Sequence, residues 1–326
     1  MRGLFVYNKG MKRLWGILLT GICAAGAYAL PAASELSIRE QVGQTIMPRV
    51  VIGKHKAFKK AVQNGEVTGF FIKTYMGLVT HPKITPQNQA KFFKKQRALL
   101  LQTIKDLQTW SQQSPHQIPL LLAVDYEGGT VTSPMYMGLP QMPSNMLLAA
   151  TGDETLVADM YAAQAAQLRQ AGINMSLGPV TDVNSNPKNP IIQTRSFGDQ
   201  ADTVGKLAAA AARALETHGV AAVNKHFPGH GDTSADSHYA QPITDLSEEE
   251  LWQKHVAAFV PSAQISSGMM TNHVVYPALD ARNSAIFSPL IIQDILRGKM
   301  NFNGLVLTDG LDMRGVGEKT IEDIVL

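Results

Sequence analysis

The sequence predicts a (β/α)8 barrel, apparently truncated after its seventh strand. Short continuous apolar runs alternate with helical stretches from Leu36 onward, and such runs are typical of parallel strands buried on both faces. Polar side chains follow almost every run, namely Asp125 and Glu127, Asp182 and Asn184, Lys225 and His226, Asn272 and His273, and Asp309. A barrel gathers all its strand ends on one rim, whereas an open doubly wound sheet uses mainly one crevice. The sequence also lacks a glycine-rich phosphate-binding loop after the first run, which favours the barrel.

The predicted strands are seven short runs of mainly aliphatic and β-branched residues. They cover residues 45–52, 67–72, 119–124, 173–180, 220–223, 268–271 and 304–307. Helices are predicted at 156–171, 204–218, 248–260 and 289–297. Gly172 and Gly219 end the first two helices, and Ser247 with Glu250 forms a capping box at the start of the third.

The C-terminal part of the predicted barrel is short. The chain stops seventeen residues after Asp309, where a barrel would still need a helix, a strand and a last helix. An open barrel exposes apolar strand edges. We therefore expect a fragment, a frameshifted product, or a barrel that another polypeptide completes.

Residues 1–29 are predicted to be a signal peptide. Basic residues precede an apolar run at 14–25, and Ala27-Tyr28-Ala29 has the pattern of a cleavage site, with Ala33 as a second candidate. The apolar run is short for a transmembrane helix, although an uncleaved anchor stays an alternative. We expect an exported protein, periplasmic or secreted, whose residues 30–326 form one barrel domain.

Charge and cysteine content narrow the function classes. Removing the leader takes away four of the 29 basic residues and none of the 26 acidic ones, so the net charge changes from +3 to −1. Nucleic-acid binding then loses its compositional support. The single cysteine, Cys23, lies in the leader, so the mature chain must rely on its hydrophobic core rather than on disulfides.

The polar segment 225–238 carries the densest set of reactive side chains. Pro228, Gly229 and Gly231 exclude a regular helix, so its polar groups are predicted to leave the C-terminal end of a strand on a loop. Metal binding is an alternative, since the segment offers His226, His230, Asp232, Asp236 and His238 as ligands. The spacing of the histidines would suit zinc only in a helix, and we predict no metal.

Two groups in the chain fit glycosidic cleavage. Asp309 emerges from an apolar strand at the predicted rim, where a carboxylate can act as nucleophile; the alternative is that it caps the next helix. Asp312 is the weaker candidate, because it lies three residues further on. Asp236 and His238 can form a pair in which the carboxylate fixes the imidazole tautomer and tunes it for general acid/base catalysis.

Six ordered segments closely resemble glycoside hydrolase family 3, and within it the β-N-acetylhexosaminidases of NagZ type. They are residues 123–129, 172–184, 189–197, 225–238, 270–280 and 307–309. The resemblance implies a (β/α)8 barrel and a retaining double displacement without a cofactor. It makes Asp309 the nucleophile, His238 the general acid/base and Asp236 its partner. The residues that it implies for holding a terminal N-acetylglucosamine are Asp125, Arg195, Lys225 and His226.

The chain departs from this family after its Glu-Gly-Gly segment. Thr130 and Ser133 stand where relatives usually have arginines, so substrate preference is expected to differ. The leading hypothesis is an exo-acting β-N-acetylglucosaminidase that acts on cell-wall fragments or related glycans. The alternatives are another family 3 β-glycosidase, a truncated non-catalytic glycan-binding protein, and a metal-dependent hydrolase.

Overall fold

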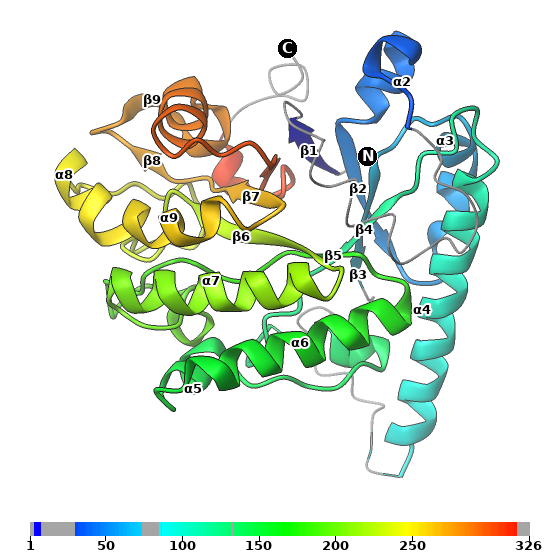
Figure 1. The fold of residues 1–326 in the computed structure, drawn as a ribbon, viewed down its shortest axis with the longest axis horizontal. Helices are drawn as coiled ribbons and strands as arrows, with labels where there is room; N and C mark the ends of the chain where they lie inside the picture. Colours follow the sequence, from blue (N-terminus) through cyan, green and yellow to red (C-terminus); the bar gives the residue numbers. More distant parts are fainter. Residues whose placement is uncertain (1–2, 8–29, 74–84, 86, 132, 318–326) are drawn as a thin grey trace.

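A single ring of strands forms the centre of the molecule (Figure 1). The computed structural model describes residues 3–7, 30–73, 85, 87–131 and 133–317. Seven strands run parallel to one another, each paired with the next along the chain. They are β2 (Ile46–Val51), β3 (Gly69–Lys73), β4 (Leu121–Val124), β5 (Met175–Ser176), β6 (Ala221–Phe227), β7 (Gly268–Thr271) and β10 (Leu305–Thr308). The predicted barrel with seven parallel strands is therefore confirmed.

The eighth position of the ring holds an antiparallel strand, β1 (Gly3–Tyr7). It pairs with β10 on one side, where Val6 lies opposite Leu307, and with β2 on the other, where Leu4 lies opposite Met47. Both edges that the parallel strands would leave open are thus paired within the described chain. The rest of the predicted signal peptide, residues 8–29, lies outside the described residues, and the leader stays a prediction.

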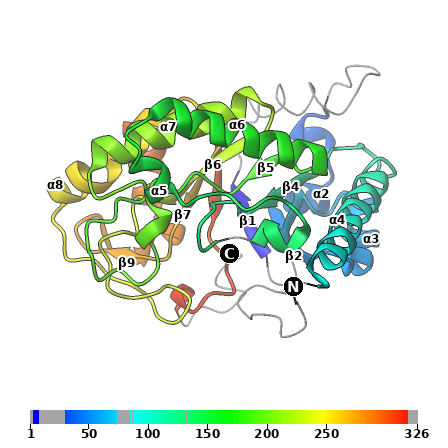
Figure 2. The same ribbon diagram turned by 90° about the horizontal axis from the view of Figure 1, so that it is seen from below.

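Helices cover the outside of the ring and alternate with the strands. The long ones are α4 (Gln89–Ser111), α6 (Glu154–Ala171) and α7 (Ala201–Thr217), and α6 and α7 pack side by side in both ribbon views (Figures 1 and 2). The shorter ones are α2 (Ile38–Gly43), α3 (Lys59–Gln63), α5 (Asn145–Ala149), α8 (Glu248–Leu251) and α9 (Ala257–Ala263), with π-helical turns at Trp252–Val256 and Leu290–Lys299. None of the described helices has both the length and the apolar character needed to cross a bilayer.

Capping groups form the helix ends, and those at Gly172 and at Ser247 were predicted. Asp153 accepts hydrogen bonds from the first turn of α6, and Gly172 ends that helix in a left-handed conformation with φ of 79°. Ser247 and Glu250 form the expected capping box at α8. The helical region predicted at 248–260 is present, but a π-helical turn divides it into α8 and α9.

The barrel interior is a separate apolar cluster made by inward-pointing side chains. It contains Met47, Leu121, Ala123, Met175, Leu177, Ala221, Val223, Met270, Leu305 and Leu307, with Phe71 packed against it. Side chains alternate between the two faces of a strand, so the next inward position lies two residues further on. That step places a layer of polar residues next to this apolar cluster, toward the C-terminal ends of the strands. The layer consists of Arg49, Lys73, Asp125, Lys225 and Asp309.

A small antiparallel hairpin outside the barrel was not predicted from the sequence. It pairs β8 (Val275–Tyr276) with β9 (Asp280–Ser284). Asp280 holds its turn by accepting hydrogen bonds from the backbone N–H groups of Arg282 and Asn283. The hairpin continues directly from the end of β7 and therefore covers one side of the barrel rim.

Candidate active site

A largely buried network of four charged side chains lies at the C-terminal ends of β4 and β6. The Lys225 Nζ donates to Asp125 Oδ1 at 2.7 Å and to Glu127 Oε1 at 2.6 Å. Arg195 approaches the same Glu127 in a bidentate arrangement, from Nε to Oε2 at 2.6 Å and from Nη2 to Oε1 at 2.8 Å. Glu127 therefore pairs with both Lys225 and Arg195, and Lys225 links Asp125 to the same network.

The charges in this network stabilise one another against burial. Burial alone would raise the pKa of Glu127, but Arg195 and Lys225 hold it well below its usual range. Burial likewise opposes the charge of Lys225, yet Asp125 and Glu127 raise its pKa above the ordinary lysine value. The pKa of Arg195 is also raised, because the attraction of Glu127 is larger than the opposing effect of burying the guanidinium. All three groups are therefore ionised at neutral pH.

His226 is fixed by a buried carboxylate behind it. Asp182 is fully buried and accepts from both the backbone N–H and the Nδ1 of His226, at 3.0 and 2.6 Å. The other ring nitrogen, Nε2, lies 3.4 Å from Nη2 of Arg195. Asp182 also accepts from the backbone N–H of His230 at 2.6 Å. One carboxylate thus orients the His226 ring and fixes the start of the following loop.

The end of β6 carries a local irregularity that affects where the site residues lie. The pairing register with β7 shifts between Lys225 and Phe227, and such bulges often redirect side chains beside active sites. Lys225 and His226 are therefore part of the strand, whereas the sequence predicted that they leave it on a loop. This placement buries both residues and corrects the prediction of strand 220–223, which ended too early.

Asp309 directly follows β10 at the inner side of the rim. Its backbone N–H donates to Thr271 at 2.9 Å, and its Oδ1 accepts from the Gly310 N–H at 2.7 Å. Burial alone would raise the pKa of Asp309, but His226, His273, the Gly310 N–H and Lys225 together lower it to about 2. The carboxylate is therefore ionised at neutral pH, as a nucleophile requires.

Asp236 and His238 form the expected pair on the loop after β6. Asp236 Oδ1 accepts from the backbone N–H and from Nδ1 of His238, both at 2.8 Å. The bond at Nδ1 leaves Nε2 as the nitrogen available for proton transfer. The His238 side chain is 55% exposed, in contrast to the buried cluster. Among the described residues, the pair hydrogen bonds to neither Asp309 nor the charged network.

Three residues of the site were not assigned from the sequence as site residues. Glu127 and Asp182 were recognised only as polar strand-end residues, and Lys73 was not singled out. Lys73 Nζ lies 3.8 Å from Asp125 Oδ2, so that carboxylate has a lysine near each oxygen. The alternation along β3 placed Lys73 two residues beyond Phe71 on the inner face, which is the signal that could have found it.

Replacing Lys73 by methionine is expected to raise KM several-fold with a smaller change in kcat. The substitution keeps an unbranched side chain of similar length but removes a cation from Asp125, which then has one fewer group to fix its orientation. The corresponding change of Lys206, an exposed lysine paired with Glu154 on the outside of the barrel, is the control and should leave KM unchanged. Equal KM values for the two variants would exclude Lys73 from binding.

Metal binding was the alternative interpretation of the polar loop. The described part of the chain contains no group of three or more His, Cys, Asp or Glu side chains placed to hold a metal ion. His226 instead contacts Asp182, and the ring nitrogens of His230 contact the hydroxyls of Thr233 and Ser237. The side chains of His226 and His230 are thus engaged by different protein partners, and Asp236 and His238 bind each other.

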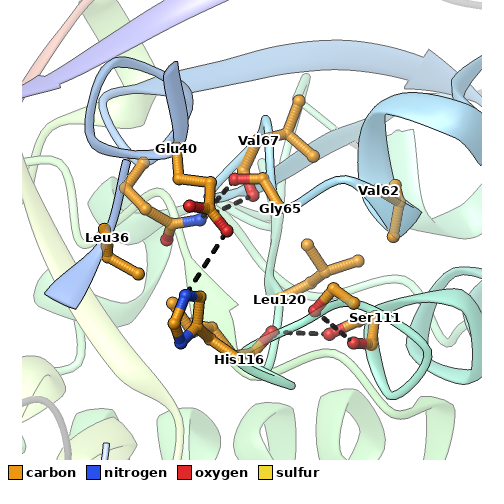
Figure 3. A pocket seen from close by; sticks show the side chains of 11 residues that line it. Leu36, Glu40, Val62, Gly65, Val67, Ser111, His116 and Leu120 are labelled. Carbon is orange, nitrogen blue, oxygen red and sulfur yellow. Dashed lines mark hydrogen bonds and ion pairs between the residues drawn. The ribbon is translucent and has the colours of Figure 1, made fainter. Parts of the chain in front are cut away.

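A cavity at the other end of the barrel is too small for a sugar (Figure 3). It lies near the N-terminal ends of β2, β3 and β4, and Glu40 points across it toward His116 at 3.5 Å. Its volume of about 10 Å³ corresponds to at most one water molecule. The catalytic candidates all lie at the opposite, C-terminal rim, where barrel enzymes carry their sites.

Comparisons with known proteins agree with this geometry. Residues 37–323 match the profile of the "Glycosyl hydrolase family 3 N terminal domain". Over 239 residues the chain is 36% identical to beta-hexosaminidase A of Pseudoalteromonas piscicida, covering 68% of this chain and 40% of that protein. It is 39% identical over 202 residues to a beta-hexosaminidase of Methylococcus capsulatus, covering 60% of this chain and 59% of that one.

A solved structure extends the similarity to the fold. A glycoside hydrolase family 3 beta-N-acetylglucosaminidase from Paenibacillus sp. str. FPU-7 superposes with a TM-score of 0.76 at 33% identity. The match covers 87% of this chain and 51% of that chain. The chain therefore spans about half the length of the relatives that it matches.

Proposed function

The chain belongs to glycosyl hydrolase family 3, and on that basis we propose that it is a retaining exo-β-N-acetylglucosaminidase. Its substrate would be a glycan with a terminal β-linked N-acetylglucosamine, from cell-wall fragments or related material. Relatives that are named beta-hexosaminidases support this substrate class. Family 3 contains other β-glycosidases, so the distinguishing feature must come from the site.

The observation that carries the proposal is the hydrogen bonding of His238. Asp236 Oδ1 binds Nδ1 of that ring at 2.8 Å, which leaves an exposed Nε2 able to carry a transferable proton. A positioned imidazole of this kind can serve as the acid and then as the base. The partly buried, ionised Asp309 supplies the second reactive group, a carboxylate at the inner side of the same rim.

The proposed reaction has two displacements at the anomeric carbon. In the first, a carboxylate oxygen of Asp309 attacks C1 while protonated His238 gives its Nε2 proton to the leaving glycosidic oxygen. The product is a glycosyl ester on Asp309 and a free alcohol. In the second, neutral His238 takes a proton from water, the water oxygen bonds to C1, and the Asp309 carboxylate leaves with its bonding electron pair.

The buried network is proposed to hold the terminal sugar. Asp125 and the Nε2 of His226 can accept hydrogen bonds from the hydroxyls of the sugar ring, while Lys225 and Arg195 present fixed donors. Their geometry is set before substrate arrives, because Glu127 and Asp182 hold the cations and the imidazole from behind. Such preorganisation lowers the cost of ordering side chains on binding.

The cellular setting is also proposed. The leader-like sequence at residues 1–29 supports export to the periplasm or beyond; if the leader is retained, it would anchor the protein in the membrane and keep β1 in the barrel. An exported enzyme of this specificity would act in turnover of peptidoglycan. A fusion of residues 1–33 to a reporter that works only outside the cytoplasm would test the export signal.

Purified protein should hydrolyse p-nitrophenyl N-acetyl-β-glucosaminide faster than p-nitrophenyl β-glucoside. We expect a preference in kcat/KM of about 100-fold or more, in line with a site that loses hydrogen bonds when the acetamido group is missing. The measurement is the initial rate of nitrophenol release from each substrate. A preference for the plain glucoside would overturn the substrate assignment, and release from neither would favour a non-catalytic glycan-binding protein.

A further inference from the structure

Ser237 lies between the two members of the Asp236–His238 pair and is buried, although Asp236 is only partly buried and His238 is exposed. The Ser237 side chain is 1% exposed, and its Oγ lies 3.1 Å from Nε2 of His230. The other nitrogen of His230, Nδ1, lies 3.0 Å from the Thr233 hydroxyl, so both ring nitrogens have partners. Burial lowers the pKa of His230 to about 4, which keeps this ring neutral at neutral pH. A neutral ring has one donor and one acceptor nitrogen, so it can hydrogen bond to both hydroxyls.

A second anchor comes from the segment that follows Asp309. The backbone N–H of Gly315 donates to the Ser237 carbonyl at 2.8 Å. The side chain of Gln241, just beyond the pair, reaches back to the Gly315 carbonyl at 3.4 Å. The loop that carries the proposed proton donor is therefore tied to the chain segment that starts at the proposed nucleophile.

The approach at Gly315 leaves no room for a side chain. A Cβ at this position would lie 2.7 Å from His273 Cβ and 2.9 Å from the Ser237 carbonyl oxygen, and real Cβ atoms essentially never come so close. His273 is itself fully buried, and its Nε2 lies 3.1 Å from the Gly310 carbonyl. The contact thus joins three rim segments, which follow β6, β7 and β10.

We infer that Gly315 is a positioning residue, which sets the place of the Asp236–His238 pair relative to Asp309 through its contacts with Ser237 and His273. The inference rests on the proposed function, because it concerns the acid/base pair of that reaction. Gly315 touches no substrate. Its effect is to hold the His238 imidazole where its Nε2 can protonate the leaving oxygen of a sugar that Asp309 attacks.

The test is the leaving-group dependence of Gly315→Ala. A misplaced general acid slows the departure of a poor leaving group, whereas a good leaving group departs without protonation. General acid catalysis typically increases the rate by about 10²–10⁴-fold. We expect kcat/KM to fall about 100-fold for phenyl N-acetyl-β-glucosaminide and less than about 5-fold for the 2,4-dinitrophenyl compound. Because kcat/KM reports only steps up to formation of the intermediate, the later hydrolysis does not obscure the comparison.

Gly298→Ala is the matched control. Gly298 lies in the last helical turn before β10, and a Cβ there meets only the Gln293 carbonyl at 3.3 Å. This variant should keep the wild-type ratio between the two substrates. If Gly315→Ala fails to give a cooperative thermal melt, Ser237→Ala replaces it, since that change removes the bond to His230 and keeps the backbone acceptor.

The outcomes separate the inference from the function on which it rests. If wild-type protein hydrolyses neither substrate, the proposed function fails and the inference with it. If wild-type protein is active and Gly315→Ala lowers kcat/KM equally for both leaving groups, or for neither, the function stands and the positioning role of Gly315 is overturned. For Ser237→Ala, about a 10-fold selective loss on the phenyl compound supports the inference, and an unchanged ratio overturns it.

Discussion

Replacing Asp309 by alanine is expected to reduce kcat/KM for p-nitrophenyl N-acetyl-β-glucosaminide by about 10⁴-fold or more. Removal of a covalent nucleophile leaves only binding and transition-state electrostatics, so losses of this order are typical. The carboxylate is well suited to the role because His226, His273 and Lys225 lower its pKa to about 2 against the effect of burial. It is therefore ionised and needs no base to activate it.

Asp312→Ala is the control for this change. Asp312 is also an acid of the segment after β10, but its side chain is 25% exposed and lies 3.3 Å from Arg49 Nη2. We expect its activity to stay within about 10-fold of wild type, since the side chain is paired outside the proposed reaction. Added azide should restore product formation in Asp309→Ala as an α-glycosyl azide, because the small anion can occupy the vacated volume. Wild-type rates in Asp309→Ala would contradict the assignment.

Replacing Glu127 by glutamine is expected to destabilise the protein by about 3–5 kcal/mol and to abolish measurable saturation with substrate. The change leaves two buried cations without their shared counter-charge, and breaking a buried ion pair on one side typically costs this much. Lys225 is 2% exposed and depends on Asp125 and Glu127 to keep its charge. The loss should appear in urea unfolding as a lower midpoint with an unchanged slope.

Glu248→Gln provides the comparison for a solvated ion pair. Glu248 and Lys299 are 3.4 Å apart and about half exposed, and such pairs contribute at most about 1 kcal/mol. We expect no resolvable shift of the urea midpoint for this variant and unchanged kinetics. A Glu127→Gln protein as stable as Glu248→Gln would mean that the buried network does not depend on Glu127.

The sequence was most informative where the two-residue alternation of side chains along a strand determines both the packing of the barrel and the position of the site residues. Apolar alternation along the strands sends Leu121 and Ala123 inward, and two residues later it sends Asp125 to the same face. The same step from Leu305 and Leu307 reaches Asp309. For this reason the parallel strands and the rim position of these acids could be predicted together.

The partners within the site could not be predicted in the same way. Glu127 and Arg195 are 68 residues apart, and Asp182 and His226 are 44 apart, so local patterns carry no information about these contacts. The end of β6 was also misplaced, because the glycine- and proline-rich sequence after Phe227 suggested that the strand stopped earlier. A register shift against β7 keeps Lys225 and His226 within the strand.

The pairing of Gly3–Tyr7 with both β10 and β2 could not be predicted from sequence patterns either. A basic and apolar N-terminal segment is typical of a leader, and nothing in its local periodicity indicates a barrel strand. An open sheet edge presents unpaired N–H and C=O groups that the backbone of many sequences can pair with, so the available edge matters more than a local pattern.

The central claim is that this barrel cleaves terminal N-acetylglucosamine through a covalent intermediate on Asp309. Trapping provides the most direct measurement: a His238→Ala variant is mixed with 2,4-dinitrophenyl N-acetyl-β-glucosaminide, digested and analysed by peptide mass spectrometry. The good leaving group departs without the acid, and loss of the base slows hydrolysis of the ester. We predict one added N-acetylhexosaminyl group on the peptide that contains Asp309. A label on a different carboxylate, or dinitrophenol release without any trapped adduct and with inversion at C1, would contradict it.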